Sequence, residues 1–130
     1  MTDIPPLPET LQFTVDGLIP AIAQQFDTGE VLMMAWMNKD SLAETLATGR
    51  VCYWSRSRRA FWRKGDTSGH IQKMVELRYD CDADTILVMV DQIGAACHEG
   101  SRSCFTNRLD TDGRVTKEET AYPANARLRA

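Results

Sequence analysis

The sequence lacks several features that define other classes of protein. It has no run approaching the ~18 apolar residues of a membrane-spanning helix, and residues 1–10 are polar and proline-rich, unlike a secretory signal. It also lacks an excess of positive charge, because its net charge is −3, whereas general nucleic-acid binding depends on neutralising many phosphates. We therefore expect a cytoplasmic protein with neither a membrane nor a nucleic-acid partner.

The chain has four cysteines in 130 residues. In a chain without an export signal a reducing compartment is expected, where thiols bind metals more often than they form disulfides. The length is sufficient for one domain with a core, and 43% hydrophobic and 25% charged residues are typical of a globular protein. No internal repeat or interdomain linker is visible.

The first half of the chain has clear signals of local structure. Strands are expected at residues 18–26 and 31–37, joined by a turn at residues 27–30. A helix is expected over residues 38–48, with Asn38 or Ser41 as its cap, Gly49 at its end, and Leu42 and Leu46 on its buried face. A short strand at residues 51–54 follows, in which Cys52 is most simply a buried hydrophobic residue.

The most informative stretch is Asp80-Cys81-Asp82-Ala83-Asp84. Carboxylates suit hard cations such as Mg²⁺, and thiolates suit Zn²⁺. Apolar residues alternate with polar ones from Val75 to Cys81, which predicts a strand whose aspartates and Cys81 lie on opposite faces. A buried strand is expected next, at residues 85–92. An EF-hand is excluded, because positions six and twelve of its loop would hold Thr85 and Asp91. A solvated acidic turn without a cation is the alternative.

The remaining thiols near this stretch are Cys97 and Cys104. If Cys81 faces away from the aspartates, it should reach towards these two thiols or towards another chain. Three thiolates would leave one position of tetrahedral zinc open, as in catalytic zinc sites. A disulfide and a nucleophilic pair of Cys97 with His98 are the alternatives.

Residues 55–72 are basic within an acidic chain. Arginine and lysine bind phosphate oxygens, and the small residues at 65–69 could form a phosphate-binding turn. The aromatic pair Phe61 and Trp62 could stack on a base or belong to the core. A solvated charged surface is the alternative. Taken together with the metal ligands, the basic stretch favours an anionic, nucleotide-like ligand. The candidate substrate contacts are Arg56, Lys64, Thr67, Ser68 and His70.

Four motifs together resemble the phosphoribosyl-AMP cyclohydrolase family of histidine biosynthesis. They are Trp54-Ser-Arg-Ser-Arg, Trp62-Arg-Lys-Gly-Asp-Thr-Ser-Gly, Asp80-Cys-Asp-Ala-Asp, and Gly94-Ala-Ala-Cys-His-Glu-Gly with Ser103-Cys-Phe. The resemblance runs from about residue 17 to residue 105, so we expect an N-terminal arm at 1–16, a cyclohydrolase domain at 17–105 and a polar tail at 106–130. That tail is too short for the second enzymatic domain of bifunctional members, which indicates the monofunctional form.

The resemblance implies a homodimer with two kinds of metal site. Mg²⁺ would lie on Asp80, Asp82 and Asp84, and zinc would be held by Cys97 and Cys104 of one subunit and Cys81 of the other. Ala83 stands where the family often has glycine, which affects the type of turn and not the ligands. The expected fold is α+β, a small mostly antiparallel sheet with one or two helices, completed by dimerisation.

The implied reaction is hydrolytic opening of the adenine ring of phosphoribosyl-AMP. Ribosylation at N1 makes C6 electrophilic, zinc lowers the pKa of a bound water to roughly 7, and addition to C6 is followed by cleavage of the C6–N1 bond. His98 is the expected general base, since the histidine pKa lies near the working pH; its alternative role is to support a zinc ligand. A zinc-stabilised nucleotide- or RNA-binding module without catalysis and a cysteine redox protein remain as other classes of function.

Overall fold

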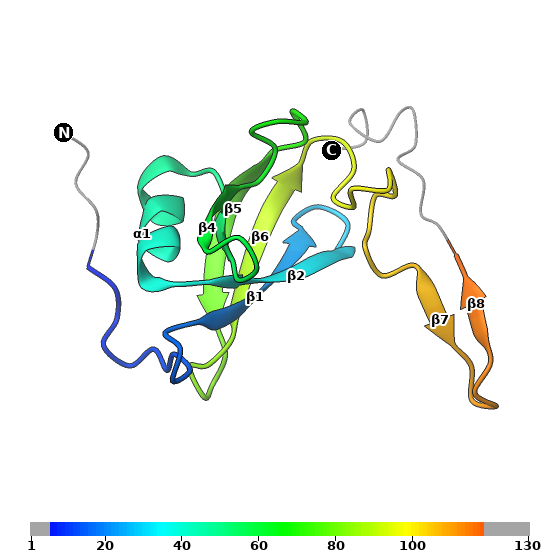
Figure 1. Cartoon of the computed structure of the whole chain (residues 1–130), viewed down its shortest axis with the longest axis horizontal. Helices are drawn as coiled ribbons and strands as arrows, with labels where there is room; N and C mark the ends of the chain where they lie inside the picture. The colour runs from blue at the N-terminus through cyan, green and yellow to red at the C-terminus, as the bar shows by residue number, and fades with distance from the viewer. Residues whose placement is uncertain (1–5, 119–130) are drawn as a thin grey trace.

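The computed structural model describes residues 6–118. Its main sheet has four strands in the order β2-β1-β6-β5 (Figure 1). The central pair, β1 and β6, is parallel, and the outer pairs β1–β2 and β5–β6 are antiparallel. The four strands are β1 (Ile19–Gln25), β2 (Val31–Met37), β5 (Gln72–Tyr79) and β6 (Ile86–Gln92). The expected α+β fold with a mostly antiparallel sheet is confirmed.

The two central strands supply most of the core. Ile19, Ala21 and Ala23 of β1 are fully buried, and the buried residues of β6 also alternate with half-buried ones. A two-residue alternation places one set of side chains on each face of a sheet, so one face of this central pair is completely enclosed. The expected hairpin at residues 27–30 connects β1 to β2 as the sequence predicts.

The predicted helix is present as α1 (Lys39–Thr48). Asn38 is its N-cap: the Asn38 side chain accepts from the Ser41 backbone N–H at 2.8 Å, and the Ser41 hydroxyl accepts from the Asn38 N–H at 3.0 Å. Gly49 ends the helix with φ of 76°, a conformation that costs little only for glycine. Leu42 is buried and Leu46 half-buried. With ten residues, α1 is too short to cross a bilayer, and residues 6–118 contain no other helix that could do so.

Two small hairpins complete the described chain. β3 (Cys52–Ser55) pairs with β4 (Ala60–Arg63), and β3 packs against α1. β7 (Asn107–Leu109) pairs with β8 (Val115–Lys117) and stands apart from the sheet, on the side away from α1 (Figure 1). This second hairpin lies in the segment we expected to be a polar tail; residues 119–130 of that segment, like residues 1–5 of the arm, lie outside the described residues.

The prediction of a regular strand from Val75 to Cys81 is wrong. The register between β5 and β6 shifts between Met74 and Glu76, so that Val75 is an extra residue and is 53% exposed. A bulge of this kind reverses which residues face the core on its two sides, and Met74 and Leu77 are the ones that pack against it. The strand then ends at Tyr79, before Cys81.

Candidate active site

The acidic turn between β5 and β6 gathers Asp80, Asp82 and Asp84. One ligand oxygen from each lies within 4.8 Å of the others, and all three residues are exposed. Backbone N–H groups of Asp84 and Thr85 donate to Asp80 Oδ1 at 2.9 and 3.2 Å. The Asp84 N–H lowers the pKa of Asp80, whereas the neighbouring Asp80 carboxylate raises the pKa of Asp84. A divalent cation would relieve the repulsion within this cluster.

Ala83 gives the turn its shape. Its φ is 59°, in the left-handed region that residues with a side chain rarely occupy. Its N–H donates to the Asp80 carbonyl at 2.9 Å, and its own carbonyl accepts from the Gln12 N–H at 2.7 Å. Glycine adopts this conformation more readily than alanine, and the turn at Ala83 brings the flanking aspartates together.

Cys97 and Cys104 lie in the loop that follows β6. Burial raises the pKa of the Cys104 thiol to about 11, and the adjacent Cys97 adds to this effect. Within residues 6–118 the aspartate cluster is the only group of three or more potential metal ligands, so no third Cys, His, Asp or Glu in that span completes a site with these two thiols.

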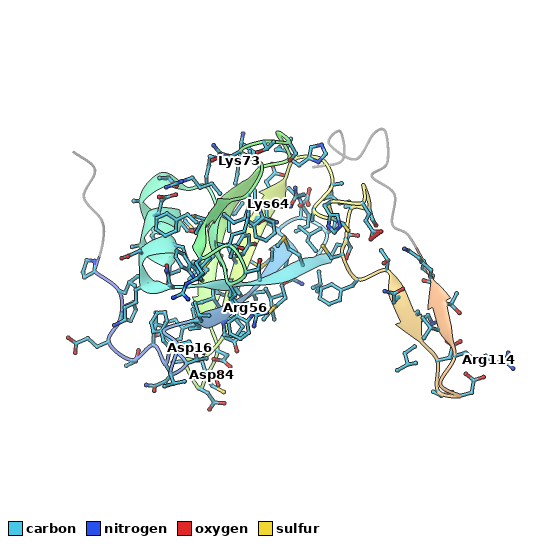
Figure 2. All side chains as sticks on the ribbon, viewed as in Figure 1. Asp16, Arg56, Lys64, Lys73, Asp84 and Arg114 are labelled. Carbon is cyan, nitrogen blue, oxygen red and sulfur yellow. The ribbon has the colours of Figure 1, made fainter. Side chains whose placement is uncertain are left out.

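Cys81 is at the other end of the sheet. It precedes the start of β6, and Cys97 follows the end of that strand, which places the two thiols roughly a strand length, ~20 Å, apart. Figure 2 likewise shows Asp84 at one end of the sheet, away from Lys64. The alternative in which Cys81 joins the other thiols of its own chain is therefore wrong.

The loop carrying the two thiols is fixed to the edge of the sheet. The Cys104 N–H donates to the Leu32 carbonyl of β2 at 2.7 Å. The Arg102 guanidinium, which is almost completely buried, forms an ion pair of 2.8 Å with Glu30 in the β1–β2 turn. These contacts hold the position of the thiols independently of any metal.

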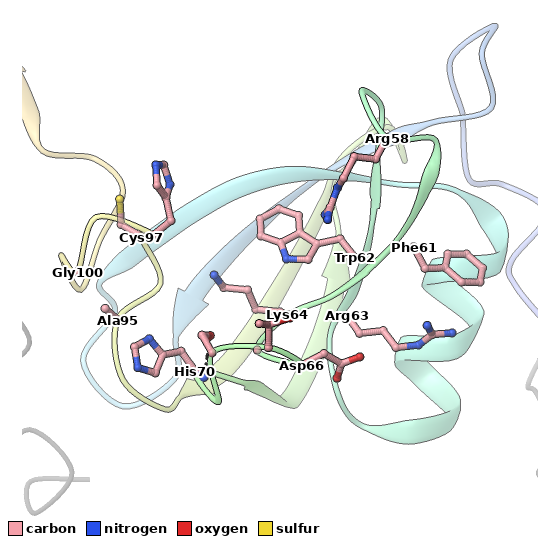
Figure 3. Close-up of a pocket in the computed structure, with 14 residues that line it drawn as sticks. Arg58, Phe61, Trp62, Arg63, Lys64, Asp66, His70, Ala95, Cys97 and Gly100 are labelled. Atoms are coloured by element: carbon pink, nitrogen blue, oxygen red, sulfur yellow. Dashed lines mark hydrogen bonds between the residues drawn. The ribbon is translucent and has the colours of Figure 1, made fainter.

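A cavity of about 440 Å³ opens between this loop and the β3–β4 hairpin. It brings together half of the predicted site residues, which come from two separate segments (Figure 3). Those lining it are Lys64, Thr67, Ser68, His70, Cys97 and His98. The loop after β4 and the loop after β6 therefore form one site.

Lys64 is placed differently from what we expected of a phosphate ligand. It is buried, its Nζ donates to the Ala96 carbonyl at 2.6 Å, and it lies 5.2 Å from the centre of the Trp62 ring. Burial lowers its pKa, and negative charge on Cys104 and Cys97 would act in the opposite direction. Its ammonium group is thus directed towards the thiol loop.

Arg56 does not line this cavity. Its guanidinium lies 5.0 Å from the centre of the Trp36 ring and borders a separate hollow with Trp54. His70 does face the cavity, and its imidazole packs on the Gly94 backbone so closely that a Cβ there would lie 2.6 Å from the ring. Any side chain at residue 94 would therefore displace His70.

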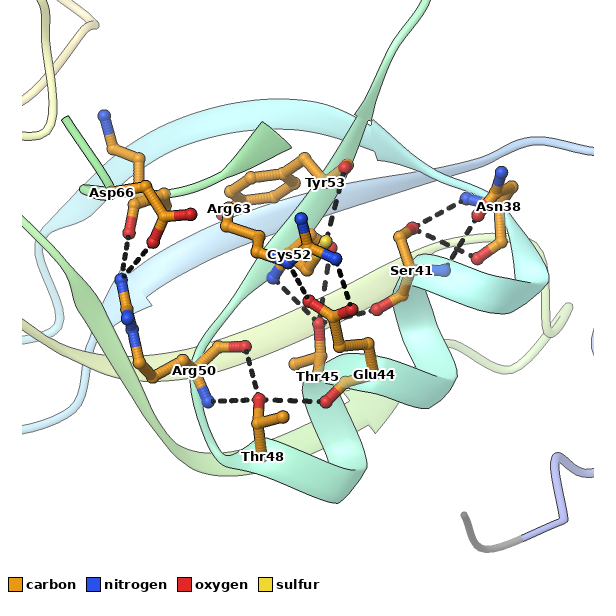
Figure 4. A network of polar contacts seen from close by, with 11 residues as sticks. Asn38, Ser41, Glu44, Thr45, Thr48, Arg50, Cys52, Tyr53, Arg63 and Asp66 are labelled. Atoms are coloured by element: carbon orange, nitrogen blue, oxygen red, sulfur yellow. Dashed lines mark hydrogen bonds and ion pairs between the residues drawn. The ribbon is translucent and has the colours of Figure 1, made fainter. Parts of the chain in front are cut away.

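Sequence reasoning did not single out two arginines that line the cavity, Arg58 and Arg63. Arg63 binds both carboxylate oxygens of Glu44 in α1, at 2.7 and 2.9 Å, which lowers the pKa of Glu44 (Figure 4). Both lie in the basic stretch identified above, but a single sequence contains no signal that ranks one arginine of such a stretch above another.

Comparison with known proteins identifies the family to which the chain belongs. The family model described as phosphoribosyl-AMP cyclohydrolase matches residues 33–106, more than half of the chain. The chain belongs to this family. Among curated relatives named phosphoribosyl-AMP cyclohydrolase, the protein of Alkalilimnicola ehrlichii is 65% identical over 111 residues, covering 85% of this chain and 78% of the relative. That of Rhodospirillum centenum is 70% identical over 95 residues, covering 73% and 71%.

The match to the cyclohydrolase family includes every element of the candidate site. Residues 33–106 run from within β2 to the end of the thiol loop and contain the cavity, the acidic turn and all four cysteines. The β7–β8 hairpin begins at Asn107, just beyond the matched region. The chain is accordingly a hydrolase of histidine biosynthesis.

Proposed function

We propose that the chain opens the adenine ring of phosphoribosyl-AMP by zinc-dependent hydrolysis of the C6–N1 bond, as a homodimer. The observation that carries the proposal is the cavity in which Cys97, His98, His70 and Lys64 meet. Its volume of about 440 Å³ suits a ligand of nucleotide size. Membership of the cyclohydrolase family supplies the substrate.

The pair Cys97 and Cys104 fits zinc by its donor chemistry, because thiolates are preferred zinc ligands. Burial, and after it the adjacent Cys97 thiol, raises the pKa of Cys104, and a divalent cation would favour both thiolates. We assign the third thiolate to Cys81 of the partner subunit, since the chain's own Cys81 is at the far end of β6. Zinc, when bound, supplies a water molecule of lowered pKa at the wall of the cavity.

His98 lines the same cavity directly beside Cys97. An imidazole accepts and releases protons near neutral pH. We assign to His98 the proton that leaves the attacking water as its oxygen bonds to C6. The same proton then passes to N1 as the C6–N1 bond breaks, so that the water is added across the broken bond and no other reactant is required.

The acidic turn is the proposed Mg²⁺ site. Three carboxylate oxygens within 4.8 Å of one another are a suitable partial shell for this hard cation. In the dimer, the acidic turn of one subunit would lie near the cavity of the other, since Cys81 adjoins the aspartates in sequence. Mg²⁺ would then neutralise charge close to the substrate's phosphates.

The test is to supply the purified protein with phosphoribosyl-AMP and to follow the absorbance change of ring opening, with bound zinc and magnesium measured on the same sample. We expect turnover that is abolished by a zinc chelator and restored by added zinc. Stoichiometric zinc with tight nucleotide binding but no turnover would contradict the enzymatic assignment and indicate a binding module instead.

A further inference from the structure

Three arginine and lysine side chains line the cavity, and two of them already have partners. Arg63 is bound by both oxygens of Glu44, which offsets its charge. Lys64 is buried and donates to the Ala96 carbonyl. Recognition of a dianionic phosphate requires a cation whose donors are not already used, so neither residue is well suited to it.

Arg58 is the third. Its Nε is 3.4 Å from the Ser55 hydroxyl, a weak contact, and no carboxylate in residues 6–118 forms an ion pair with it. Figure 3 shows its guanidinium at one side of the Trp62 indole, on the opposite side from His70 and Asp66. A fork of N–H donors is thus available at one end of the cavity.

The other end is formed by the turn at residues 65–69. The Asp66 and Gly69 N–H groups are used within the turn, on the Arg63 and Gly65 carbonyls. Those of Thr67 and Ser68 have no partner in the part of the chain that the structure describes. Water is the ordinary partner of such groups on a surface, and a phosphate oxygen can replace it. The Asp66 carboxylate, which would repel an anion, is paired with Arg50 at 3.0 Å.

We propose that the cavity binds a bisphosphorylated ligand lengthwise, with Arg58 holding one phosphate and the turn at residues 65–69 holding the other. The inference rests on the proposed function, whose substrate has one phosphate monoester on each of two riboses. Trp62 and Lys64 lie between the two ends (Figure 3), beside the loop with Cys97 and His98, so the base would be positioned at the proposed reacting groups. Arg58 is a binding residue and takes no part in proton transfer.

The first experiment compares Arg58→Gln with Arg58→Lys and Arg59→Gln, using phosphoribosyl-AMP. Arg59 is the adjacent arginine and does not line this cavity. We expect Arg58→Gln to raise KM roughly 10- to 100-fold, the usual effect of losing a hydrogen-bonded charge, with kcat within about threefold. Arg58→Lys should recover part of the loss, and Arg59→Gln should resemble the wild type. If the KM of Arg58→Gln were no higher than that of Arg59→Gln, the assignment would be overturned.

The second experiment tests whether the two ends bind different phosphates. Thr67→Glu places a carboxylate on the turn, and Thr67→Gln is its uncharged control of the same size. If Arg58 and the turn hold separate phosphates, the effects of Arg58→Gln and Thr67→Glu on KM should multiply within a factor of about two. If the KM of the double variant rose much less than the product of the two single effects, both groups would contact one phosphate, which contradicts the lengthwise arrangement.

The same variants separate this inference from the proposed reaction. Stopped-flow quenching of tryptophan fluorescence gives a Kd for phosphoribosyl-AMP whether or not ring opening follows. If the wild type showed no turnover but Arg58→Gln bound phosphoribosyl-AMP more weakly than the wild type, the phosphate assignment would stand and the proposed reaction would be rejected. If the wild type turned over phosphoribosyl-AMP but the Kd of Arg58→Gln were unchanged, the reaction would stand and the phosphate assignment would be rejected. A wild type that neither binds nor turns over phosphoribosyl-AMP would reject both.

Discussion

Gly65 packs directly on the backbone of Ile71. A Cβ at residue 65 would lie 2.4 Å from the Ile71 nitrogen, and the φ of Gly65 is +87°. This contact closes the turn at residues 65–69 on itself and so fixes the end of the cavity formed by Thr67 and Ser68.

The contact predicts different results for two glycines of the same turn. Gly69 also has a positive φ, +81°, but a Cβ there meets nothing within 4 Å. Gly69→Ala should therefore cost about 1–2 kcal/mol for the backbone conformation alone, and Gly65→Ala about 1–3 kcal/mol more, because a backbone atom cannot move aside as a side chain can. Urea unfolding of both variants is the measurement, and equal losses would show that the Gly65–Ile71 contact is not tight in solution.

Replacing either loop thiol should remove zinc and activity together. Cys97→Ser and Cys104→Ser each exchange a thiolate for a hydroxyl, a poor zinc ligand. Cys52→Ala is the control: Cys52 is fully buried, with a pKa raised to about 12 chiefly by burial, and lies on β3 next to α1. Metal analysis of Cys52→Ala should therefore show stoichiometric zinc. Full zinc in either serine variant would contradict the proposed site.

A shared zinc site predicts that two inactive variants will complement each other. Cys81→Ala and Cys97→Ala proteins are unfolded, mixed and refolded. A mixed dimer then has one intact site, with Cys81 from the Cys97→Ala chain and the other two thiols from the Cys81→Ala chain. Random pairing makes about half of the dimers mixed, so about a quarter of wild-type activity should return.

The complementation experiment requires that each variant alone refolds as a dimer, which sedimentation can establish. If every site took its ligands from a single chain, all sites in the mixture would lack a thiolate. No recovery in properly refolded mixtures would therefore mean that Cys81 does not serve the other subunit.

Asp82→Asn should weaken the response to Mg²⁺ and leave zinc bound. The substitution removes one of three carboxylate charges from the acidic turn but leaves the three proposed zinc thiolates, Cys81, Cys97 and Cys104, unchanged. Titration with Mg²⁺ and metal analysis of the same preparation measure both effects. Loss of zinc from Asp82→Asn would mean that the two metal sites depend on each other.

Local patterns predicted the fold well where the structure is itself local. The β1–β2 hairpin and α1 follow from alternation, a turn and a capping residue that are all close in sequence. The bulge at Val75 was missed because it is defined by the pairing of β5 with β6. The β7–β8 hairpin was missed because all its strand residues are exposed, although Asp112-Gly113 is a recognised hairpin signal.

The candidate site was predictable by residue type and less so by position. His70 and His98 line one cavity, as expected of residues that share a substrate. The sequence could not tell that Lys64 is buried on Ala96 or that Arg56 stacks on Trp36, since both depend on how distant segments pack. The same holds for Arg63, whose partner Glu44 comes from α1.

The parallel pairing of β1 with β6 has a consequence for how the chain folds. The Gln92 N–H donates to the Gln25 side chain, 67 residues away in sequence, so the central ladder cannot form until most of the chain is available. Closing a long loop is entropically unfavourable before its contacts are made. The β1–β2 and β5–β6 hairpins, whose strands are close in sequence, should therefore form first. Docking β1 onto β6 then becomes the slow step, and core substitutions at Ala21 or Val88 should slow refolding more than changes in α1.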